Sequence, residues 1–291
     1  MARWGSMARR STVWRESTEI RRETVLAIEA MVIPVEAAHQ KVAPGHQEID
    51  LRHCGALEMA DRLMTCRYPV KEVARRHGVH ATFMPKPLNA ENGSGMHIHM
   101  SLARVDGIMR HAKEITGVCA QWVNSFKRLV PGFEAPVYIT WACRNRSNMI
   151  RIPMYQVGEE GATRIEFRAP DSACNPYLAF AVLLYAGPEG IDQSYPLPDP
   201  VEIDVYSLTD DERADLGIES LPGSLNEAIA CMQRSALVRQ ALGDHIFAKF
   251  IENKQIEWDV YRSQVHDYEI KRYLVELRKA ANWENACQGM L

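Results

Sequence analysis

The order of the expected strands and helices predicts an α+β protein, in which an antiparallel sheet carries helices packed outside it. Two stretches, Gly95–Leu102 and Thr163–Arg168, alternate strictly between apolar and polar residues, as half-buried strands do. Segments with helical periodicity lie before, between and after them. With 291 residues and 46% hydrophobic content, the chain can bury a proper core in one large domain or two small ones.

The composition argues against several classes of partner and site. The net charge of −3 gives no basis for a nucleic-acid or membrane surface. The longest apolar run, Pro176–Pro188, is shorter than the ~20 residues of a membrane span. Seven cysteines without a C-x-x-C pair argue against a disulfide framework or zinc knuckle and favour a reducing, cytoplasmic setting.

The N-terminal segment Met1–Trp14 is basic and contains no acidic residue. It also lacks an apolar core segment, so it does not have the pattern of a secretory signal. A transit peptide is one alternative, but we expect a disordered leader over residues 1–16. Residues 17–291 are then expected to form the folded part of the chain.

Two helices and two strands are expected in the first part of the chain. In order, the expected helix, two strands and helix are Glu19–Met31, Ile33–Ala38, Gln47–Arg52 and Ala56–His77. Glu48, Asp50 and Arg52 share one face of the second strand. Pro69 should kink or split the second helix, which is expected to stop at Gly78.

The rest of the chain is expected to be mainly helical. The expected helices are Gly107–Leu129, Tyr177–Ala186, one from Ser224 to near Gly243, Asp244–Ser263 and Asp267–Lys279, with a strand at Val137–Trp141. Asn175-Pro176 offers a helix cap followed by proline at the first helical position. Ser224 and Glu227 form a capping-box pattern, and Pro188–Pro200 is expected to be a Pro-rich connection.

Imidazole and hydroxyl groups follow one face of the strand Gly95–Leu102. The polar residues are His97, His99 and Ser101, and they alternate with Met96, Ile98, Met100 and Leu102. The preceding run Asn92-Gly93-Ser94-Gly95 provides a backbone that can approach a ligand closely. Two histidines on one strand face can form a metal and phosphate site. The alternative is a pair of exposed polar histidines.

The strand Thr163–Arg168 carries a carboxylate between two guanidinium groups. Ile165 and Phe167 occupy one face, and Arg164, Glu166 and Arg168 occupy the other. This arrangement suits an anionic substrate beside a metal ion. A solvated, charged strand face is the alternative explanation. Together the two strands suggest chemistry on a phosphate or a carboxylate.

Five motifs in order carry a family resemblance. They are KPLNAENGSGMHIHMS (Lys86–Ser101), KRLVPGFEAPV (Lys127–Val137), RNRSNMIRIP (Arg144–Pro153), RIEFRAPD (Arg164–Asp171) and NPYLAFA (Asn175–Ala181). From about Glu19 onwards, the chain resembles the catalytic domain of glutamine synthetase. The resemblance implies that family's fold, a curved antiparallel sheet with helices packed outside.

The resemblance also implies a reaction and its cofactors. Glutamine synthetases use ATP to phosphorylate the side-chain carboxylate of glutamate, and ammonia then displaces phosphate. Divalent ions, Mg²⁺ or Mn²⁺, neutralise the triphosphate and the carboxylate, and arginines stabilise the transferring phosphoryl group. The expected partners are therefore glutamate, ammonia and ATP. A ligase that joins glutamate to another amine would have the same glutamate-side residues.

Matching the motifs residue by residue gives expected roles. Glu48 resembles a ligand of the first metal ion, while His97 and Glu166 resemble ligands of the second. The expected ATP contacts are Glu36, His99, Ser101, Arg151 and Arg164. The expected catalytic residues are Glu134, which takes the ammonium proton, and Arg128, Arg146 and Arg168. Glutamate is expected to bind at Asn92, Gly93, Arg128 and Arg168.

The chain departs from the family pattern at the first metal ion. In the run His39-Gln40-Lys41-Val42, lysine replaces a ligating glutamate, and an ammonium group cannot coordinate a cation. Lys41 is expected to swing away or to pair with Glu48. We also find no N-terminal β-domain and no Glu-x-Glu strand before Glu19.

These departures predict a truncated family member with impaired synthetase activity. The alternative from a different class is a catalytically weak or inactive structural or regulatory subunit that mixes with a full-length synthetase. A decaying gene without function is a third possibility. The expected assemblies are a homo-oligomer or a mixed ring, without nucleic-acid or membrane partners.

Overall fold

Two small sheets and a body of helices build the fold, which a computed structural model describes over residues 2–4, 13–101, 104–145, 147–153 and 164–274. One sheet has the strand order β1-β3-β2 and the other the order β4-β7-β6-β5. The strands are β1 (Ala2–Trp4), β2 (Val35–Gln40), β3 (Gln47–Leu51), β4 (Ile98–Met100), β5 (Trp141–Ala142), β6 (Ile150–Arg151) and β7 (Ile165–Phe167).

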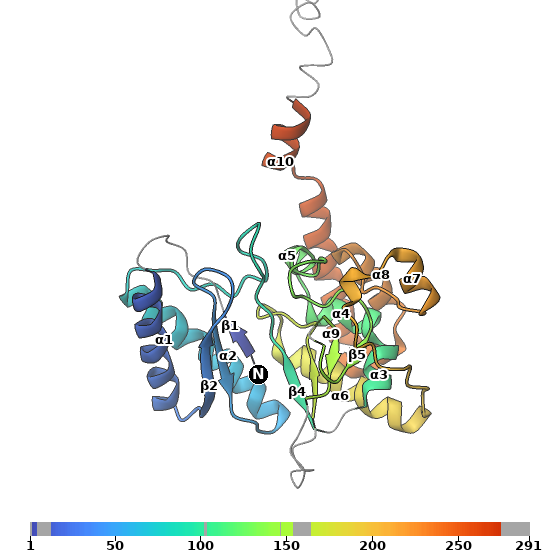
Figure 1. Ribbon diagram of the computed structural model, residues 1–291, viewed down its shortest axis with the longest axis horizontal. Helices are drawn as coiled ribbons and strands as arrows, with labels where there is room; N and C mark the ends of the chain where they lie inside the picture. The colour runs from blue at the N-terminus through green and yellow to red at the C-terminus, as the bar shows by residue number, and fades with distance from the viewer. Residues whose placement is uncertain (1, 5–12, 102–103, 146, 154–163, 275–291) are drawn as a thin grey trace, which may run out of the picture.

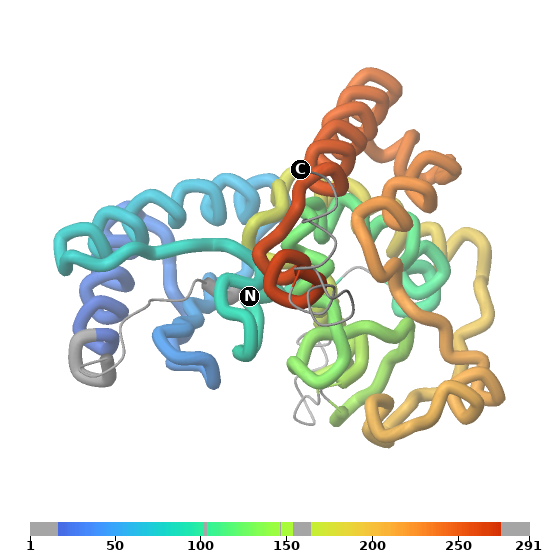
Figure 2. Tube along the Cα trace, turned by 90° about the horizontal axis from the view of Figure 1, so that it is seen from above, coloured from blue at the N-terminus to red at the C-terminus, as the bar shows by residue number. Residues whose placement is uncertain are grey.

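The first sheet and two helices, α1 (Val13–Ala30) and α2 (Ala56–Arg76), form the N-terminal layer. Ile28, Ile49 and Leu63 belong to one buried cluster, because the apolar faces of both helices pack on the sheet. Figures 1 and 2 show this layer, in blue, side by side with the larger helical body. The expected order of helix, two strands and helix is confirmed.

The prediction for α2 is only partly right. The helix continues through Pro69, which is buried within it, so the proline does not split the helix into two. The chain leaves the helix after Arg76, and Gly78 has the positive φ of 69° that favours glycine. The predicted stop is therefore confirmed.

The structure corrects the predicted disordered leader in two places. Ala2–Trp4 forms β1, which pairs antiparallel with β3 and places Ala2 opposite Ile49. The helix α1 begins at Val13, before the predicted boundary at residue 17. Pairing with β3 gives this segment backbone hydrogen bonds that its composition does not reveal. The remainder of the predicted leader lies outside the described residues.

The second sheet is mixed rather than purely antiparallel. β4 pairs antiparallel with β7, and β7 pairs antiparallel with β6, but β5 and β6 run parallel. The backbone N–H of Cys143 donates to the Glu202 carboxylate over 2.7 Å, and the Asn148 amide donates to the Val201 carbonyl over 2.9 Å. Because residues 201–202 hold the chain after β5, it does not form the hairpin that an antiparallel pair would use.

The long helix predicted at Gly107–Leu129 is three short helices instead. They are α3 (Val105–Arg110), α4 (Ala112–Cys119) and α5 (Val123–Arg128). His111 (φ −100°, ψ 7°) and Ala120 (φ −134°, ψ 72°) have non-helical backbones. The Cys119 carbonyl accepts a hydrogen bond from the Asp171 N–H, a contact that competes with continuing the helix.

The described helices of the remaining chain are α6 (Pro176–Gln193), η2 (Val205–Ser207), α7 (Asp210–Asp215), α8 (Leu225–Gln233), α9 (Ala236–Arg262), α10 (Asp267–Glu269) and the π-helical turn η3 (Ile270–Leu274). Two of them, α6 and α8, begin where their predicted caps place them, whereas α9 begins at Ala236, before the predicted Asp244, and η2 and α7 were not predicted. The Asn175 side chain accepts hydrogen bonds from the backbone of Tyr177 and Leu178, and Ser224 caps α8. α6 runs past Pro188, so the predicted Pro-rich connection starts later.

The helix predicted to start at Ser224 ends earlier than Gly243. A turn at Arg234 and Ser235 separates α8 from α9, where the Ser235 hydroxyl accepts from the Val238 N–H. Gly243 interrupts α9 with a φ of 72°, so the break predicted there does occur within this element. Within the described part of the chain, no helix is long and apolar enough to cross a membrane.

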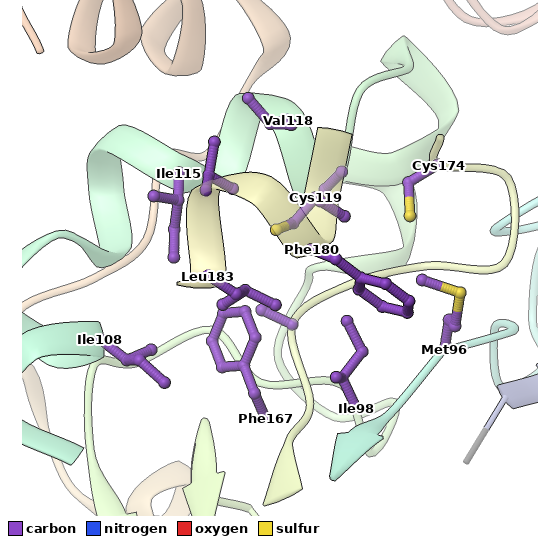
Figure 3. Packing of buried hydrophobic residues seen from close by; sticks show 14 of the residues in the cluster. Met96, Ile98, Ile108, Ile115, Val118, Cys119, Phe167, Cys174, Phe180 and Leu183 are labelled. Atoms are coloured by element: carbon purple, nitrogen blue, oxygen red, sulfur yellow. The ribbon is translucent and has the colours of Figure 1, made fainter. Parts of the chain in front are cut away.

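The core lies between the second sheet and the helices of the body. Figure 3 shows Met96 and Ile98, from the predicted strand Gly95–Leu102, and Phe167 of β7 packing near Phe180 and Leu183 of α6. These side chains are 8% exposed or less. The predicted alternation is therefore confirmed on its apolar face, since Met96 and Ile98 are buried as expected for that face.

Two glycines set the distance between α3 and α6. A Cβ on Gly107 would lie 2.1 Å from the Ala186 carbonyl oxygen, and a Cβ on Gly190 would lie 2.3 Å from Asp106 Oδ1. Both contacts are closer than real Cβ atoms allow, and one of them is with backbone. The helices can therefore approach this closely only with glycine at both positions.

Candidate active site

The two alternating strands meet at a buried pair formed by His97 and Glu166. Nδ1 of His97 lies 2.5 Å from Oε1 of Glu166, although the residues are 69 positions apart in sequence. His97 is 1% exposed and Glu166 is 4% exposed. The pairing of β4 with β7 places His99 directly opposite Glu166, which brings both predicted histidines to one carboxylate.

Two arginines also reach the Glu166 carboxylate. Nη1 of Arg151 donates to Oε2 over 3.0 Å, and Nε of Arg168 lies 3.6 Å from Oε1. Burial raises the pKa of Glu166, but the His97 hydrogen bond and the charges of His97 and Arg168 outweigh it. The net effect lowers the pKa well below the ordinary value, so Glu166 is ionised at neutral pH.

His99 lies in the same polar row, on β4. Both nitrogens are buried and have no hydrogen-bond partner among the described residues. Burial is the main cause that lowers its pKa to about 4, assisted by the charges of Arg164 and Arg151. The imidazole is therefore neutral at pH 7 and can both donate and accept one hydrogen bond.

On the first sheet, Lys41 pairs with Glu48. The ammonium group of Lys41 contacts the Glu48 carboxylate, which is buried on β3. Of the two arrangements predicted for Lys41, the structure contains the pairing. Glu48 thus has a protein cation beside it where the family resemblance predicts a metal ion.

Arg128 supports the glycine-containing loop before β4. Its guanidinium donates to the carbonyls of Arg168, Ala169 and Pro170 over 2.7 to 3.2 Å. A Cβ on Gly95 would lie 2.6 Å from Arg128 Nη2, and a Cβ on Gly93 would lie 2.8 Å from its Cγ. Arg128 therefore fixes the backbone under this loop. Its predicted contact with glutamate stays a prediction.

The loop that carries Glu134 is held at both ends. The Asn92 amide donates to Glu134 Oε2 over 3.3 Å, and Glu134 has a positive φ of 53°. The Lys86 ammonium lies 3.3 Å from the centre of the Phe133 ring. The Tyr206 hydroxyl donates to the Ala135 carbonyl. Glu134 itself is exposed, so its carboxylate can meet a ligand.

The remaining predicted site residues are less tightly placed. Glu36, Ser101 and Arg164 are exposed. Arg146 lies outside the described residues. The pairing partner of Glu166, Arg151, is half-buried on β6 and reaches the carboxylate from the side opposite β4. The structure therefore brings together the predicted residues His97, His99, Glu166, Arg151 and Arg168.

Sequence reasoning missed several residues around the site. His39 Nε2 lies 3.2 Å from Asp50 Oδ2, next to Glu48. The pattern had placed Asp50 on the face of Glu48, but it gave no signal for a histidine on the neighbouring strand. Lys86 and Tyr206 could not be assigned to the Glu134 loop, because their contacts with it depend on tertiary packing.

Comparison with known proteins identifies the family. The family model for "Glutamine synthetase, catalytic domain" matches residues 5–107 and 103–273. The glutamine synthetase of Mycolicibacterium smegmatis is 49% identical over 276 residues, which cover 87% of this chain and 62% of that protein. That of Thermotoga maritima is 45% identical over 278 residues, with 88% and 63% covered.

A solved structure has the same fold. The structure described as "GmaS/ADP complex-Conformation 1" has a TM-score of 0.78 and 32% sequence identity, and the match covers 90% of this chain and 66% of that one. The chain spans only 62 to 63% of the two curated relatives above. By its family model, its relatives and its fold, the chain belongs to the glutamine synthetase catalytic-domain family.

Proposed function

We propose that this chain provides the catalytic domain for ATP-dependent ligation of ammonia to the side-chain carboxylate of glutamate, through an acyl phosphate. Membership of the family supports the reaction. The observation that carries the proposal is the buried Glu166 carboxylate with His97, Arg151 and Arg168 around it. In such a cluster the imidazole and the carboxylate can bind a metal ion, and the two guanidinium groups can bind phosphate.

The residues present fit one of the two divalent ions that the family implies. His97 and Glu166 are an imidazole and a carboxylate in contact, which is a donor pair suited to Mn²⁺ and acceptable to Mg²⁺. An ion bound there would neutralise the charge of the phosphates. The predicted set for the first ion does not fit in the same way, because Lys41 already contacts Glu48.

The protein's own residues would then bind and orient the substrates. In the proposal, His99, Ser101, Glu36 and Arg164 contact the nucleotide. Arg146, Arg151 and Arg168 stabilise the phosphoryl group, and Asn92, Gly93 and Arg128 position glutamate. Glu134 accepts the proton of ammonium. The contact between Glu134 and Asn92 supports this role, because it links the proton acceptor to the glutamate-binding loop.

A weak or absent activity of the isolated chain is part of this proposal. Loss of one ligating carboxylate can cost several kcal/mol of transition-state stabilisation, and each ~1.4 kcal/mol is tenfold in rate. The Lys41–Glu48 pair therefore also favours a second candidate function, a structural or regulatory subunit that assembles with a full-length synthetase.

A cytoplasmic location fits the six cysteines of the described part, all of which are free thiols.

The test combines binding and turnover on one sample. Calorimetry would measure ATP binding with Mg²⁺ or Mn²⁺, and a phosphate-release assay would measure turnover that depends on glutamate and ammonia. Metal-dependent binding with slow turnover supports the proposal, and turnover with another amine would identify a glutamate–amine ligase. Binding without turnover, with co-purification of a full-length synthetase, supports the subunit. Absence of ATP binding contradicts both.

A further inference from the structure

Lys86 occupies an unusual place for a lysine, because its ammonium group lies inside the loop of residues 86–94 that precedes the His97 strand. The residue is only 8% exposed, whereas lysines are almost never buried without a partner. The Ser94 N–H donates to the Pro85 carbonyl over 2.8 Å, which closes this loop at its base. Nζ of Lys86 donates to the Glu91 carbonyl over 2.5 Å, so the side chain crosses the interior of the loop.

The backbone of Lys86 is fixed from α5. Oδ1 of Asn124 accepts a hydrogen bond from the Lys86 N–H over 2.7 Å, and the Asn124 amide donates to the Lys86 carbonyl over 3.1 Å. Because one side chain bonds both backbone groups of Lys86, the point from which the lysine side chain starts is held against the helical body. The position of the ammonium group is therefore defined by the fold.

The same ammonium group also reaches the Glu134 loop, which comprises residues 131–136. Nζ of Lys86 lies 3.3 Å from the centre of the Phe133 ring, where the negative face of the ring attracts a cation. The next residue, Glu134, accepts a hydrogen bond over 3.3 Å from the amide of Asn92, which belongs to the 86–94 loop. Two neighbouring contacts therefore join the two loops.

We propose that Lys86 is a positioning residue that ties the 86–94 loop to the Glu134 loop, so that both loops take up their glutamate-binding arrangement together. The inference rests on the proposed function and deepens it, since that proposal places Asn92 and Glu134 beside the substrate but gives Lys86 no role. An ammonium group suits the task, because it can donate to a carbonyl and attract the face of a ring at the same time.

The burial of this charge indicates that Lys86 contributes more to positioning than to stability. Burial opposes the charged form and lowers the pKa of Lys86 below its ordinary value. An apolar side chain of similar length would avoid this cost while filling the same space. Lys86→Met should therefore leave the free energy of unfolding nearly unchanged while it releases the two loops from each other.

The experiment combines amide hydrogen exchange, measured by mass spectrometry, with calorimetry of glutamate binding in the presence of Mg²⁺ and a non-hydrolysable ATP analogue. Lys86→Met should speed exchange several-fold in both loops. Phe133→Leu, at a half-buried position, should also speed exchange in the 86–94 loop, although the substitution lies in the other loop. Each variant should weaken glutamate binding by about 5- to 10-fold, and the double variant by no more than either alone.

The matched control is Lys71→Met on α2. It removes another lysine near an aromatic ring, because Nζ of Lys71 lies 5.6 Å from the centre of the Phe83 ring, but this lysine is exposed and lies outside both loops. Exchange in the two loops and glutamate binding should stay as in the wild type.

The possible outcomes separate this inference from the proposed function. If Lys86→Met leaves exchange in the Glu134 loop unchanged, or Phe133→Leu leaves exchange in the 86–94 loop unchanged, the tie between the loops is overturned. Faster exchange with an unchanged glutamate dissociation constant would overturn the positioning role. A wild-type protein that binds no glutamate would overturn the proposed function, whereas the exchange measurement would still support or overturn the tie.

Discussion

Glu114 shows how one side chain can link helices of the body. Its carboxylate accepts a hydrogen bond from the Ser235 hydroxyl before α9 and lies 3.1 Å from Nδ1 of His111. Burial raises its pKa, but the His111 and Ser235 hydrogen bonds outweigh this and lower the pKa below the ordinary value of 4.5. The ionised form is therefore the one that the folded state prefers.

This preference gives a pH-dependent prediction. Because the folded pKa of Glu114 is depressed, its contribution to stability is present above pH 4.5 and is lost as the pH falls below it. Glu114→Gln should lower the free energy of unfolding by about 1 kcal/mol at pH 7, and the difference from the wild type should shrink on acidification. Urea titrations at several pH values would measure it.

An exposed carboxylate serves as the control for this prediction. Glu252 pairs with Lys249 on the surface of α9 and is exposed. Glu252→Gln should leave the urea midpoint unchanged at every pH. A constant difference between Glu114→Gln and the wild type from pH 7 to pH 3 would contradict the assignment.

Replacing Glu166 should reduce the free energy of unfolding more than replacing Glu114 does. Its replacement by Gln leaves the buried guanidinium of Arg168 without its carboxylate and weakens the Arg151 contact. Loss of one partner from a buried ion pair costs roughly 3 kcal/mol. Glu166→Gln should lower the free energy of unfolding by about that amount in urea denaturation. Glu58→Gln, on the exposed side of α2, is the matched control.

At the scale of the element, the loop before β4 depends on glycine. A Cβ at Gly95 would press on Arg128, whose guanidinium cannot move easily because it is bonded to three carbonyls. Gly95→Ala should destabilise the fold by about 1 to 3 kcal/mol. Gly55→Ala is the control, because nothing lies within 4 Å of its Cβ. Thermal unfolding of both variants would test this. Equal midpoint temperatures for Gly95→Ala and Gly55→Ala would contradict the close packing at Gly95.

The Glu134 loop makes a separate prediction about motion. Tyr206 anchors its end through the Ala135 carbonyl, and burial raises the pKa of this tyrosine to about 12, so the hydroxyl remains a donor. Tyr206→Phe should speed amide hydrogen exchange around residues 133–136 several-fold without changing global stability. Mass spectrometry would measure the exchange. The exposed Tyr68→Phe on α2 should leave it unchanged.

The elements that could be predicted from the sequence are those with local signals. Asn175-Pro176 gave the start of α6, because a cap and a proline act on adjacent residues. The break at Ala120 could not be predicted, since it depends on a hydrogen bond from Asp171 to the end of α4. Periodicity alone therefore merged three helices into one.

In the candidate site, too, local patterns could be predicted from the sequence, whereas contacts between distant segments could not. The alternating patterns predicted which face of each strand carries His97 and Glu166, but the 2.5 Å contact between them depends on the pairing of strands far apart in sequence. Lys41 was predicted to pair with Glu48 as one of two options, and the structure contains that pair. Family resemblance, rather than pattern, supplied the roles.

At the scale of the whole molecule, Arg67 joins the N-terminal layer to the helical body. Its guanidinium donates from α2 to the carbonyls of Ser172 and Cys174 over 3.0 and 2.9 Å. Arg67→Met should separate the unfolding of the two parts, so that urea transitions followed by fluorescence and by circular dichroism no longer coincide. Arg75→Met is the control, because Arg75 pairs only with Glu72 of its own helix in the described structure. Coincident transitions in Arg67→Met would contradict this role.

The close contact between α3 and α6 also limits which sequences can adopt this fold. Gly107 and Gly190 face backbone and side-chain atoms at distances that exclude any Cβ. In a saturation-mutagenesis library selected only for folding, both positions should return glycine and nothing else. Positions 107 and 190 are far apart in the sequence. If each permits glycine alone, mutational data by themselves would reveal that these two helices are in contact.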